Sequence, residues 1–417
     1  MRPIPRDPAP ESSASLLREG YGFIRNRCQQ LQAPLFQTRL LMQDTICLSG
    51  EEAARLFYDD RRFQRAGAAP RMLRKTLLGE GGVQTLDGPE HHHRKQLFMS
   101  LLGESGVAEL VALARREWSS AVGRWIGDGQ VQLHHEVQAI LTRAVCAWAG
   151  VPLPEDEVET RRDQLATLID GAGGIGARHW RARWARKAAE GWGIELIERV
   201  RAGTLPVAEG RALAAVAQYR NLDGSLLEPR VAAVELLNLL RPTVAVSRFV
   251  IYAALELRAH PEWHERLRED DQALESFAQE VRRLYAFFPF MAARVREDFE
   301  WQGYHFPKGT RVLLDLFGTN REPTRWPAPD IFDPQRFERW NGSAFNFITQ
   351  GGGEPHRGHR CPGEPLAIAL LVDALRVLTR EIRYRVPEQD LGVDMARMPA
   401  QPESGLLIEA VERLTAR

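Results

Sequence analysis

Residues 345–371 constrain the fold of this chain more than any other stretch of its sequence. They read FNFITQGGGEPHRGHRCPGEPLAIALL, with four glycines before one cysteine, Cys361, and an apolar helical pattern after it. Because glycine has no Cβ atom, the backbone here can pass close to a bulky, flat group. Pro362 suits the first turn of a helix, so Cys361 is expected just before a helix N-terminus. Any fold of this chain must bring this loop, the cysteine and the helix together.

The position of Cys361 indicates its chemistry. Amide groups and a helix N-terminus favour a thiolate over a thiol. A thiolate held in this way is an iron ligand or a nucleophile. A buried, inert thiol is the commonest state of a free cysteine, but the glycine context disfavours it here. The other three cysteines are scattered and have no zinc-site spacing, which is typical of reduced thiols.

The composition predicts a globular protein with a large core. The chain has 417 residues, of which 44% are hydrophobic and 26% charged. Acidic and basic residues balance at 55 each, so the overall charge favours neither nucleic acid nor an acidic membrane as a partner. The start, MRPIPRDPAPESSA, lacks the apolar core of a signal peptide. A cytoplasmic protein with no membrane anchor is expected, with residues 1–14 as a loose N-terminal arm and 15–417 as a single domain.

The periodicity of apolar residues predicts a mainly α fold with a minor β-sheet region. Helical spacing dominates the chain, and four ranges have it most clearly: 104–126, 228–258, 272–285 and 364–382. Residues 299–317 predict a hairpin followed by a strand, and the region 321–345 predicts ordered irregular chain.

A basic run, ARHWRARWARKAAE, occupies residues 177–190 and contains two tryptophans. The favoured interpretation is a solvated helix face with the two indoles buried. The alternative is a surface patch for a partner or a membrane.

Three motifs in order resemble those of the cytochrome P-450 enzymes. FITQGGG…GHRCPGE resembles the haem-binding loop of that family, with Cys361 in the place of the axial iron ligand. EVRR resembles its ExxR pair, here Glu280 and Arg283, whose spacing puts both side chains on one helix face. FDPQRF resembles the segment whose arginine, Arg336, joins that pair. By itself, Glu280–Arg283 would read as an exposed ion pair. The resemblance implies a cytochrome P-450 fold and haem b as the cofactor.

Residues 87–98, DGPEHHHRKQLF, resemble the helix of that family that holds the haem propionates. The matching residues are His91 and Lys95, and His359 in the cysteine loop is expected to join them. Three adjacent histidines also suggest a metal site. Successive helix positions point in different directions, so the three rings cannot all bind one ion.

The segment LLNLLRPTVAV contains Arg241 and Pro242 in an otherwise apolar helical pattern. Pro242 lacks an N–H, so the carbonyl of Asn238 loses its usual partner and the helix is expected to kink. Arg241 cannot act as a general acid at neutral pH, but it can hold a carboxylate through two parallel hydrogen bonds. The alternative is an arginine paired with a buried acid from another segment.

The Arg-Pro pair resembles the fatty acid peroxygenases of the cytochrome P-450 superfamily, and the resemblance covers nearly the whole chain. Ordinary members of the superfamily have an acid–alcohol pair at this place. The resemblance implies that Arg241 anchors the carboxylate of a long-chain fatty acid and that hydrogen peroxide is the oxidant, with no redox partner. The substrate carboxylate then serves as general acid and base, with Arg241, Pro242 and Gln84 in the catalytic site. Oxidation is expected at the α or β carbon, because the head group is anchored.

Gln84, in GGVQTLDG, bears on the product. Hydroxylating members of this family tend to have Gln at the matching position and decarboxylating members His, so the resemblance implies a hydroxy acid rather than a terminal alkene. By itself, Gln84 reads as a loop residue bonded to backbone. Leu78, Phe288 and Phe290 are expected to line the channel for the acyl chain, although ordinary core positions are the more frequent role for such residues.

Three other functions remain open at this point. A conventional monooxygenase would receive electrons from redox partners, and the Arg-Pro pair argues against it. A sensor that binds haem and fatty acid without turnover would have much the same residues. A cysteine-nucleophile hydrolase would need a histidine and an acid arranged around Cys361.

Overall fold

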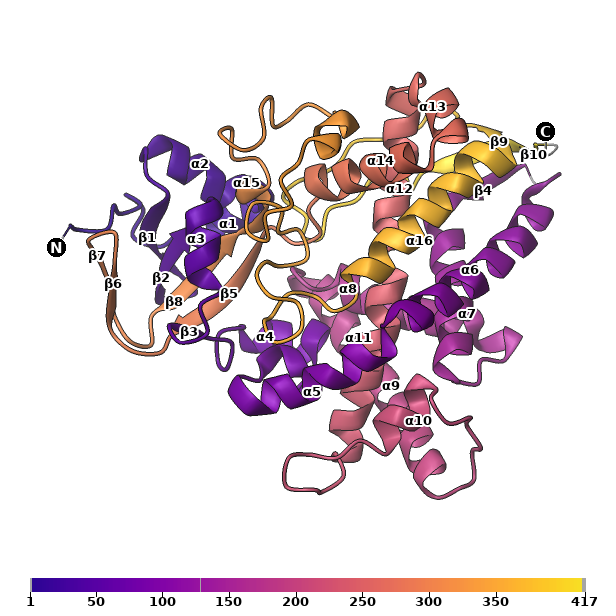
Figure 1. Cartoon of the computed structure of the whole chain (residues 1–417), viewed down its shortest axis with the longest axis horizontal. Coiled ribbons are helices and arrows are strands. Elements are labelled where there is room, and N and C mark those ends of the chain that lie inside the picture. Colours follow the sequence, from indigo (N-terminus) through magenta and orange to yellow (C-terminus); the bar gives the residue numbers. More distant parts are fainter. Residues whose placement is uncertain (1, 128, 415–417) are drawn as a thin grey trace.

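The computed structural model describes residues 2–127 and 129–414. Helices form most of it; one group of strands lies at the end beside the N-terminus, and β4, β9 and β10 lie at the other end, beside the C-terminus (Figure 1). The predicted mainly α fold with a minor sheet region is confirmed. The helices have the following bounds: α1 Ser13–Glu19, α2 Phe23–Gln30, α3 Glu51–Phe57, α4 Arg71–Leu73, α5 Gly88–Leu101, α6 Glu104–Trp125, α7 Leu133–Ala149, α8 Val158–Asp170, α9 Gly176–Arg201, α10 Ala212–Ala217, α11 Pro229–Ala245, α12 Ser247–Ala259, α13 Trp263–Glu269, α14 Asp271–Leu284, α15 Leu316–Thr319 and α16 Glu364–Arg376.

A five-stranded sheet forms the smaller end of the molecule, in the order β1-β2-β8-β5-β3. β2 and β8 are parallel and the other neighbours are antiparallel. The predicted hairpin is β6 and β7, and the strand predicted after it is β8. The strands of the five-stranded sheet are β1 Leu35–Leu40, β2 Gln43–Leu48, β3 Phe63–Gln64, β5 Phe290–Val295 and β8 Arg311–Asp315, and the hairpin of β6 Phe299–Trp301 and β7 Tyr304–Phe306 is a separate two-stranded sheet. A three-stranded sheet at the other end joins β4 Gln130–Gln132, β9 Ile382–Arg385 and β10 Leu407–Arg413.

The N-terminal arm lies against the edge of the sheet rather than loose. Gln37 of β1 donates its N–H to the carbonyl of Pro5 at 2.8 Å and accepts from the N–H of Asp7 at 2.9 Å. The Asp7 carboxylate also pairs with Arg27 at 2.7 Å. An edge strand has unpaired backbone groups, and they hold this proline-rich segment although its composition is typical of a free arm.

Two of the long helical patterns fall into two parts. The pattern over 228–258 contains α11 and α12, which meet at Val246, and α11 stays helical on both sides of Pro242. The helical pattern is interrupted at Val246, four residues after Pro242, and the kink expected at Pro242 itself stays a prediction. The helix continues past the proline because a proline removes one hydrogen bond and leaves the flanking ones. The pattern over 364–382 contains α16 and a π-helical turn, and β9 begins at Ile382.

The basic run lies on α9, and its two tryptophans are exposed. Trp180 is 58% exposed and Trp184 is 72% exposed, so the prediction that both indoles are buried is wrong. In the half of α9 that carries the basic run, the buried residues are Ala182, Arg186 and Ala189. α9 packs against α8 and α11, and a Cβ on Gly193 would lie 2.9 Å from that of Ala233, whereas Trp180 and Trp184 belong to the solvent-exposed side of the helix.

The main core surrounds α11. This helix packs against α7, α8 and α9, and its side chains from Ala232 to Leu240 are buried. Two charged residues of α11, Glu235 and Arg241, are consequently placed in the interior of the molecule. No single described helix is long and apolar enough to cross a membrane; α5 and α6 would pass such a test only as a pair, and they are bent by 52° at their junction.

Candidate functional site: a cysteine loop and a buried arginine

The loop before Cys361 is closed by its own backbone. The N–H of Cys361 donates to the carbonyl of Gln350 at 2.9 Å, and the N–H of Gly353 donates to Ala344 at 2.9 Å. Gly351 has a φ of 96°, and a Cβ on Gly352 would lie 2.7 Å from the Ala344 oxygen. These glycines are therefore required by the tight packing of the loop on itself, in addition to any flat group that the loop faces.

Cys361 precedes α16, as predicted, with Gly363 as the N-cap residue. Burial raises the pKa of the Cys361 thiol above its ordinary value, and the hydrogen bond from the Gly363 amide lowers it only in part. The Gly363 amide thus favours the thiolate, as expected, while burial of the sulfur opposes it. A cation bound at the sulfur would be needed to reverse the balance, because a metal ion deprotonates the thiol that ligates it.

Glu280 and Arg283 form a buried ion pair on α14. Two nitrogen–oxygen contacts of 2.7 and 2.8 Å join them, and both side chains are fully buried. Arg336 donates to the same carboxylate at 3.1 Å, from the region predicted to be irregular. Arg283 also donates to the carbonyls of Asn320 and Pro329. The three predicted residues thus lie together, and the alternative of an exposed pair is excluded.

Arg282, the other arginine of EVRR, was missed by the sequence reasoning. It is fully buried and pairs with Glu364 at 2.5 Å. It also donates to the Gln350 side chain at 2.8 Å. Gln350 and Glu364 flank Cys361 in sequence, so Arg282 ties the cysteine loop and α16 to α14. The only signal for this role was its place beside Arg283.

Arg241 is buried on α11 and has no carboxylate partner among the residues that the structure describes. Its guanidinium donates to the carbonyl of Leu77, and to the side-chain oxygen of Asn238 at 3.3 Å. Burial, together with the nearby Arg186, lowers its pKa to about 9. Arg241 is therefore charged at neutral pH, and it has unused capacity for an anion.

Gln84 and Arg241 meet at one residue, Asn238. The amide nitrogen of Asn238 donates to Gln84 at 3.2 Å and to Glu235 at 2.9 Å, while its oxygen accepts from Arg241. Glu235 is held in turn by Arg94 at 2.7 Å. Asn238 was also missed by the sequence reasoning, although a polar residue three positions before Arg241 in an apolar helix was a visible signal.

The predicted channel residues do not all lie together. Leu78 ends a π-helical turn, Arg74–Leu78, directly after the carbonyl that Arg241 contacts. Phe288 packs on the cluster around Phe57, whereas Phe290 packs on the cluster around Phe23 and belongs to β5. Alternation along β5 sends Phe290 to the other face of the sheet from the Phe57 cluster. Phe290 therefore fits the alternative of an ordinary core residue.

Comparison with protein families gives a local match. The family model for cytochrome P450 matches residues 251–392. Among curated proteins, (+)-vincadifformine 19-hydroxylase of Catharanthus roseus is 32% identical over 126 residues, which is 29% of this chain and 24% of that protein. Cytochrome P450 71A8 of Mentha piperita is 30% identical over 171 residues, or 36% and 33% of the two chains. The match thus spans a quarter to a third of the curated relatives.

Comparison with solved structures covers the whole chain. A variant of cytochrome P450SP alpha (CYP152B1) is 45% identical with a TM-score of 0.95, over 98% of this chain and 100% of that one. Cytochrome P450EX alpha (CYP152N1), solved with myristic acid, is 44% identical with a TM-score of 0.96, over 99% and 100%. A variant of cytochrome P450 OleT, solved with arachidonic acid, is 33% identical with a TM-score of 0.96, over 99% of each chain.

The chain belongs to the CYP152 family of fatty acid peroxygenases. The predicted cytochrome P450 fold is confirmed, and membership implies haem b as the cofactor. The sequence reasoning reached this family from the Cys361 loop, the Glu280–Arg283 pair and Arg241.

The side chains expected to hold the haem carboxylates converge in this peroxygenase. The rings of His91 and His359 stack with centroids 3.9 Å apart, and Lys95 donates to the carbonyls of Gly358 and Arg360. Burial lowers the pKa of Lys95 to about 8. The alternative of a metal site at His91, His92 and His93 is not supported. His93 contacts the carbonyl of Arg220 at 2.8 Å, and the described residues contain no group of three metal-binding side chains.

Arg65 is a further residue that fits the haem and that the sequence reasoning missed. Its guanidinium lies 4.2 Å from the Phe57 ring, is buried, and has two nitrogens without a hydrogen-bond partner. Burial lowers its pKa to about 10, so it is charged at neutral pH. A buried cation with unused donors fits a propionate carboxylate, so the residues present agree with the cofactor that the family implies. No sequence motif marked this arginine.

Proposed function

We propose that this chain is a peroxygenase that uses hydrogen peroxide to hydroxylate long-chain fatty acids at the α carbon, with the β carbon as the secondary position. The observation that carries the proposal is Arg241, a buried cation on the central helix whose contacts are a carbonyl and an amide oxygen. The similar structures that contain myristic and arachidonic acid add support, since both ligands carry a carboxylate on an apolar chain.

Arg241 has the role of carboxylate anchor. Its guanidinium can give two parallel hydrogen bonds to the fatty acid head group. Asn238 fixes the orientation of the guanidinium, and it also contacts Gln84. With the head group held, the carbons next to it stay closest to the reacting centre. Anchoring therefore sets the position of oxidation, because a reaction between held groups favours the atom already in place.

The substrate carboxylate is the group that moves the proton. The nearest acid on α11, Glu235, already accepts from Arg94, from the N–H of Val83 and from Asn238. The hydroxyl of Thr243 donates to the Leu239 carbonyl at 2.9 Å, so it is not free for this role. Arg241 does not release its proton at neutral pH. The anchored carboxylate is thus the best-placed general acid and base.

Gln84 favours hydroxylation over decarboxylation. Its side-chain oxygen already accepts from Asn238, so its amide group is left as a neutral donor toward the substrate. Glutamine cannot deliver a proton or carry a positive charge at neutral pH, whereas histidine can do both. The expected product is therefore a 2-hydroxy fatty acid rather than a terminal alkene.

Bound haem b would supply the oxygen-activating iron, and the Cys361 thiolate would hold it. In this proposal His91, Lys95, His359 and Arg65 hold the two carboxylates of the cofactor. Pro242 shapes the helix beside Arg241, and Leu78 and Phe288 contact the acyl chain. No redox partner is required, because hydrogen peroxide brings both the oxygen and the oxidising equivalents. The four free cysteines of the described chain support the cytoplasm as the compartment.

The test uses the purified, haem-loaded protein with a long-chain saturated fatty acid and hydrogen peroxide, without a reductase. Products are identified by mass spectrometry. A 2-hydroxy acid is the expected product. A terminal alkene would retain Arg241 as the anchor and contradict the role given to Gln84. Turnover that requires an electron-transfer partner and proceeds without peroxide would contradict the peroxygenase proposal and favour a conventional monooxygenase.

A further inference from the structure

The first half of α9 presents tryptophan and cationic side chains to solvent on one face. Trp180, Arg181, Trp184 and Lys187 recur at helical spacing and are all exposed, and we call this set the basic tryptophan face. Ile175, just before the helix, is 62% exposed. Large apolar side chains this exposed are uncommon, and here three of them occur within ten residues of chain.

The cations of this face are not neutralised by neighbouring acids. Residues 171–189 contain no Asp or Glu, and Arg181 and Lys187 form no ion pair within the described part of the chain. The acids at the two ends are engaged elsewhere: Asp170 pairs with Arg248, and Glu190 pairs with Arg186. The chain as a whole has no net charge, so the positive charge of this face is a local feature.

The segment that packs beside α9 also exposes basic and apolar side chains. The π-helical turn Arg74–Leu78 packs against α9, and the exposed Arg71 and Met72 precede it. The carbonyl of Leu77 in this turn accepts from Arg186 of α9 and from Arg241 of α11. A single turn of chain thus separates this surface from the buried arginine of the candidate site.

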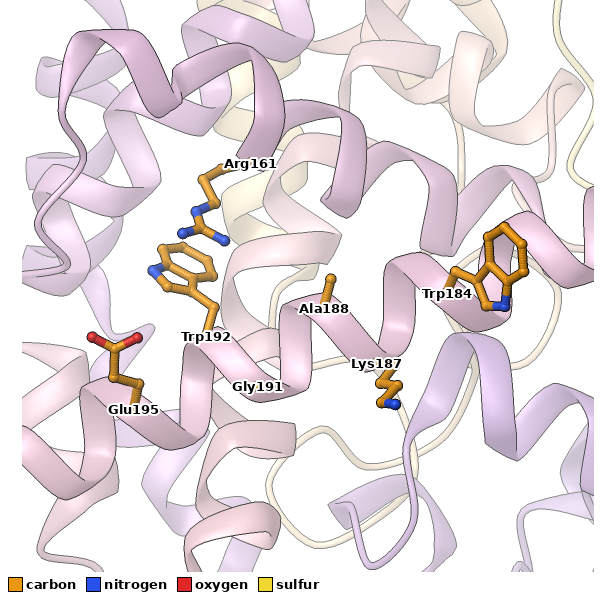
Figure 2. Close-up of a pocket in the computed structure, with 7 residues that line it drawn as sticks. All are labelled: Arg161, Trp184, Lys187, Ala188, Gly191, Trp192 and Glu195. Carbon is orange, nitrogen blue, oxygen red and sulfur yellow. The ribbon is translucent and has the colours of Figure 1, made fainter.

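A shallow groove of about 430 Å³ continues the basic tryptophan face along α9 (Figure 2). Trp184 and Lys187 lie at one end, and Glu195 lies at the other. Small residues, Ala188 and Gly191, leave the groove open between them. Trp192 lines the groove as well, with the Arg161 guanidinium 4.6 Å from its ring. The groove therefore combines two indoles of α9 with one cation of α9, Lys187, and one cation of α8, Arg161.

We propose that the basic tryptophan face binds the surface of an anionic lipid bilayer and that the fatty acid enters the protein from that side. Indoles settle at the boundary between headgroups and acyl chains, and Arg and Lys are attracted to anionic headgroups. A single row of side chains on one helix is too narrow for a stable protein interface, which buries about 800 Å² on each partner. The protein lies on the bilayer through this face and does not span it.

Binding to lipid rests on the exposed indoles and unpaired cations alone. Entry of the fatty acid from the bilayer rests in addition on the proposed function. The experiment therefore measures binding and turnover separately, so that the two can fail independently.

The binding test uses the haem-loaded full-length protein with vesicles of phosphatidylglycerol or of phosphatidylcholine, in co-sedimentation at low and high salt. We expect binding to phosphatidylglycerol that high salt reverses, and much weaker binding to phosphatidylcholine. Arg181→Gln with Lys187→Gln should weaken binding about 25-fold, since each cation near an anionic surface is worth about fivefold. Trp180→Ala with Trp184→Ala should weaken it about tenfold or more, because apolar area is no longer buried.

Matched controls change exposed residues of the same types elsewhere. Met42→Ala with Ile331→Ala removes exposed apolar side chains, and Arg339→Gln with Arg383→Gln removes exposed cations. Both control proteins should bind vesicles as the wild type does. An equal loss in controls and test variants would show general charge or hydrophobicity instead of a specific face, and would overturn the proposal. Absence of wild-type binding at low salt would overturn it as well.

Measurements of turnover and of self-association distinguish entry of the fatty acid from the bilayer, lipid binding without turnover, and a dimer formed through this face. With fatty acid dispersed in detergent, the α9 variants should keep wild-type peroxide-dependent turnover, and with fatty acid held in phosphatidylglycerol vesicles they should lose most of it. Vesicle binding without any turnover would reject the proposed function and leave the lipid-binding surface in place. A wild-type dimer that Trp184→Ala dissociates, with no vesicle binding, would show that this face joins two copies of the chain.

Discussion

This chain buries two groups of arginines whose surroundings differ. The group on α14 is paired: Arg283 and Arg336 share the Glu280 carboxylate, and the remaining donors of Arg283 reach backbone carbonyls. The group around Leu77 is not paired in this way: Arg241 and Arg186 donate to the same carbonyl, and each cation raises the cost of charging the other. Arg186 has Glu190, while Arg241 has no acid in the described chain.

The difference indicates which charges serve the fold and which serve a ligand. A buried pair with all its hydrogen bonds made is a fixed junction, and losing one partner leaves the other charge uncompensated. A buried cation without an acid partner already carries the free-energy cost of an uncompensated charge in the folded protein. Removing such a cation should therefore not destabilise the fold. The paired group should therefore control stability and haem retention, and Arg241 should control substrate binding.

The largest effect is expected from Glu280→Ala. Arg283 and Arg336 would be left buried without their carboxylate, at a cost of about 3–5 kcal/mol in the free energy of unfolding. We expect little folded, haem-loaded protein, measured by thermal unfolding and by haem content after purification. Glu338→Ala is the matched control, because Glu338 pairs with Arg266 at an exposed site. Normal stability of the Glu280→Ala protein would contradict the conclusion that the paired arginines, unlike Arg241, control stability.

Arg241→Ala should have the opposite effect, with stability kept and turnover of fatty acids lost. Its melting temperature should equal or exceed that of the wild type, because an unpaired buried cation is removed. Its kcat/KM for long-chain fatty acids should fall about 10³-fold or more, since the head group is no longer held. Thermal unfolding and steady-state kinetics on the same preparation check both expectations. A large loss of stability with fatty acid turnover retained would make Arg241 a structural residue.

Arg65→Leu should weaken retention of the cofactor without unfolding the protein. Removing one charge-assisted hydrogen-bonding partner of a propionate should increase the rate of haem loss about tenfold. The rate is measured by transfer of haem to an excess of apomyoglobin. Arg65→Lys should recover part of the retention, because a charge remains. Unchanged haem loss in Arg65→Leu would show that its unpartnered nitrogens face something other than the cofactor.

The pH dependence of substrate binding should identify the same arginine. The folded-state pKa of Arg241 is lowered to about 9 by burial and by Arg186. Below that value the guanidinium is charged and binds a carboxylate, and above it affinity should fall about tenfold per pH unit. The unfolded chain keeps its proton to higher pH, so deprotonation relieves the cost of burial and adds stability as pH rises above about 9. Fatty acid binding is followed by the haem spectrum, with imidazole as a ligand that needs no guanidinium. Constant fatty acid affinity to pH 11 would contradict this assignment.

The smallest expected change is in product composition. Gln84→His should move products from the 2-hydroxy acid toward the terminal alkene by severalfold, because histidine can carry a proton where glutamine cannot. Gas chromatography of one reaction gives both products. Gln84→Asn is the control, since it keeps an uncharged amide. An unchanged ratio in Gln84→His would show that Gln84 contacts Asn238 and not the substrate.

The sequence alone was sufficient to predict the family of this chain and some of the residues of its candidate site. A loop of glycines before Cys361, two charges three residues apart on one helix, and an arginine before a proline are local patterns, and local geometry determines what they can do. The spacing of Glu280 and Arg283 alone predicted that their side chains meet, because residues three apart share a helix face. Arg241 was recognised for the same reason, as a cation out of place in an apolar helix.

Only the tertiary structure decided which polar groups are left without partners. Arg65, Arg282 and Asn238 each have a partner or a role in a segment distant in sequence. Arg282 and Asn238 had only a weak local signal, their places near Arg283 and Arg241, and Arg65 had none. The N-terminal arm is held because the edge of β1 offers free backbone groups, and Trp184 is exposed because α11 occupies the other side of α9. Burial and hydrogen-bond satisfaction depend on what other segments bring to a position, so a pattern within one segment cannot supply them.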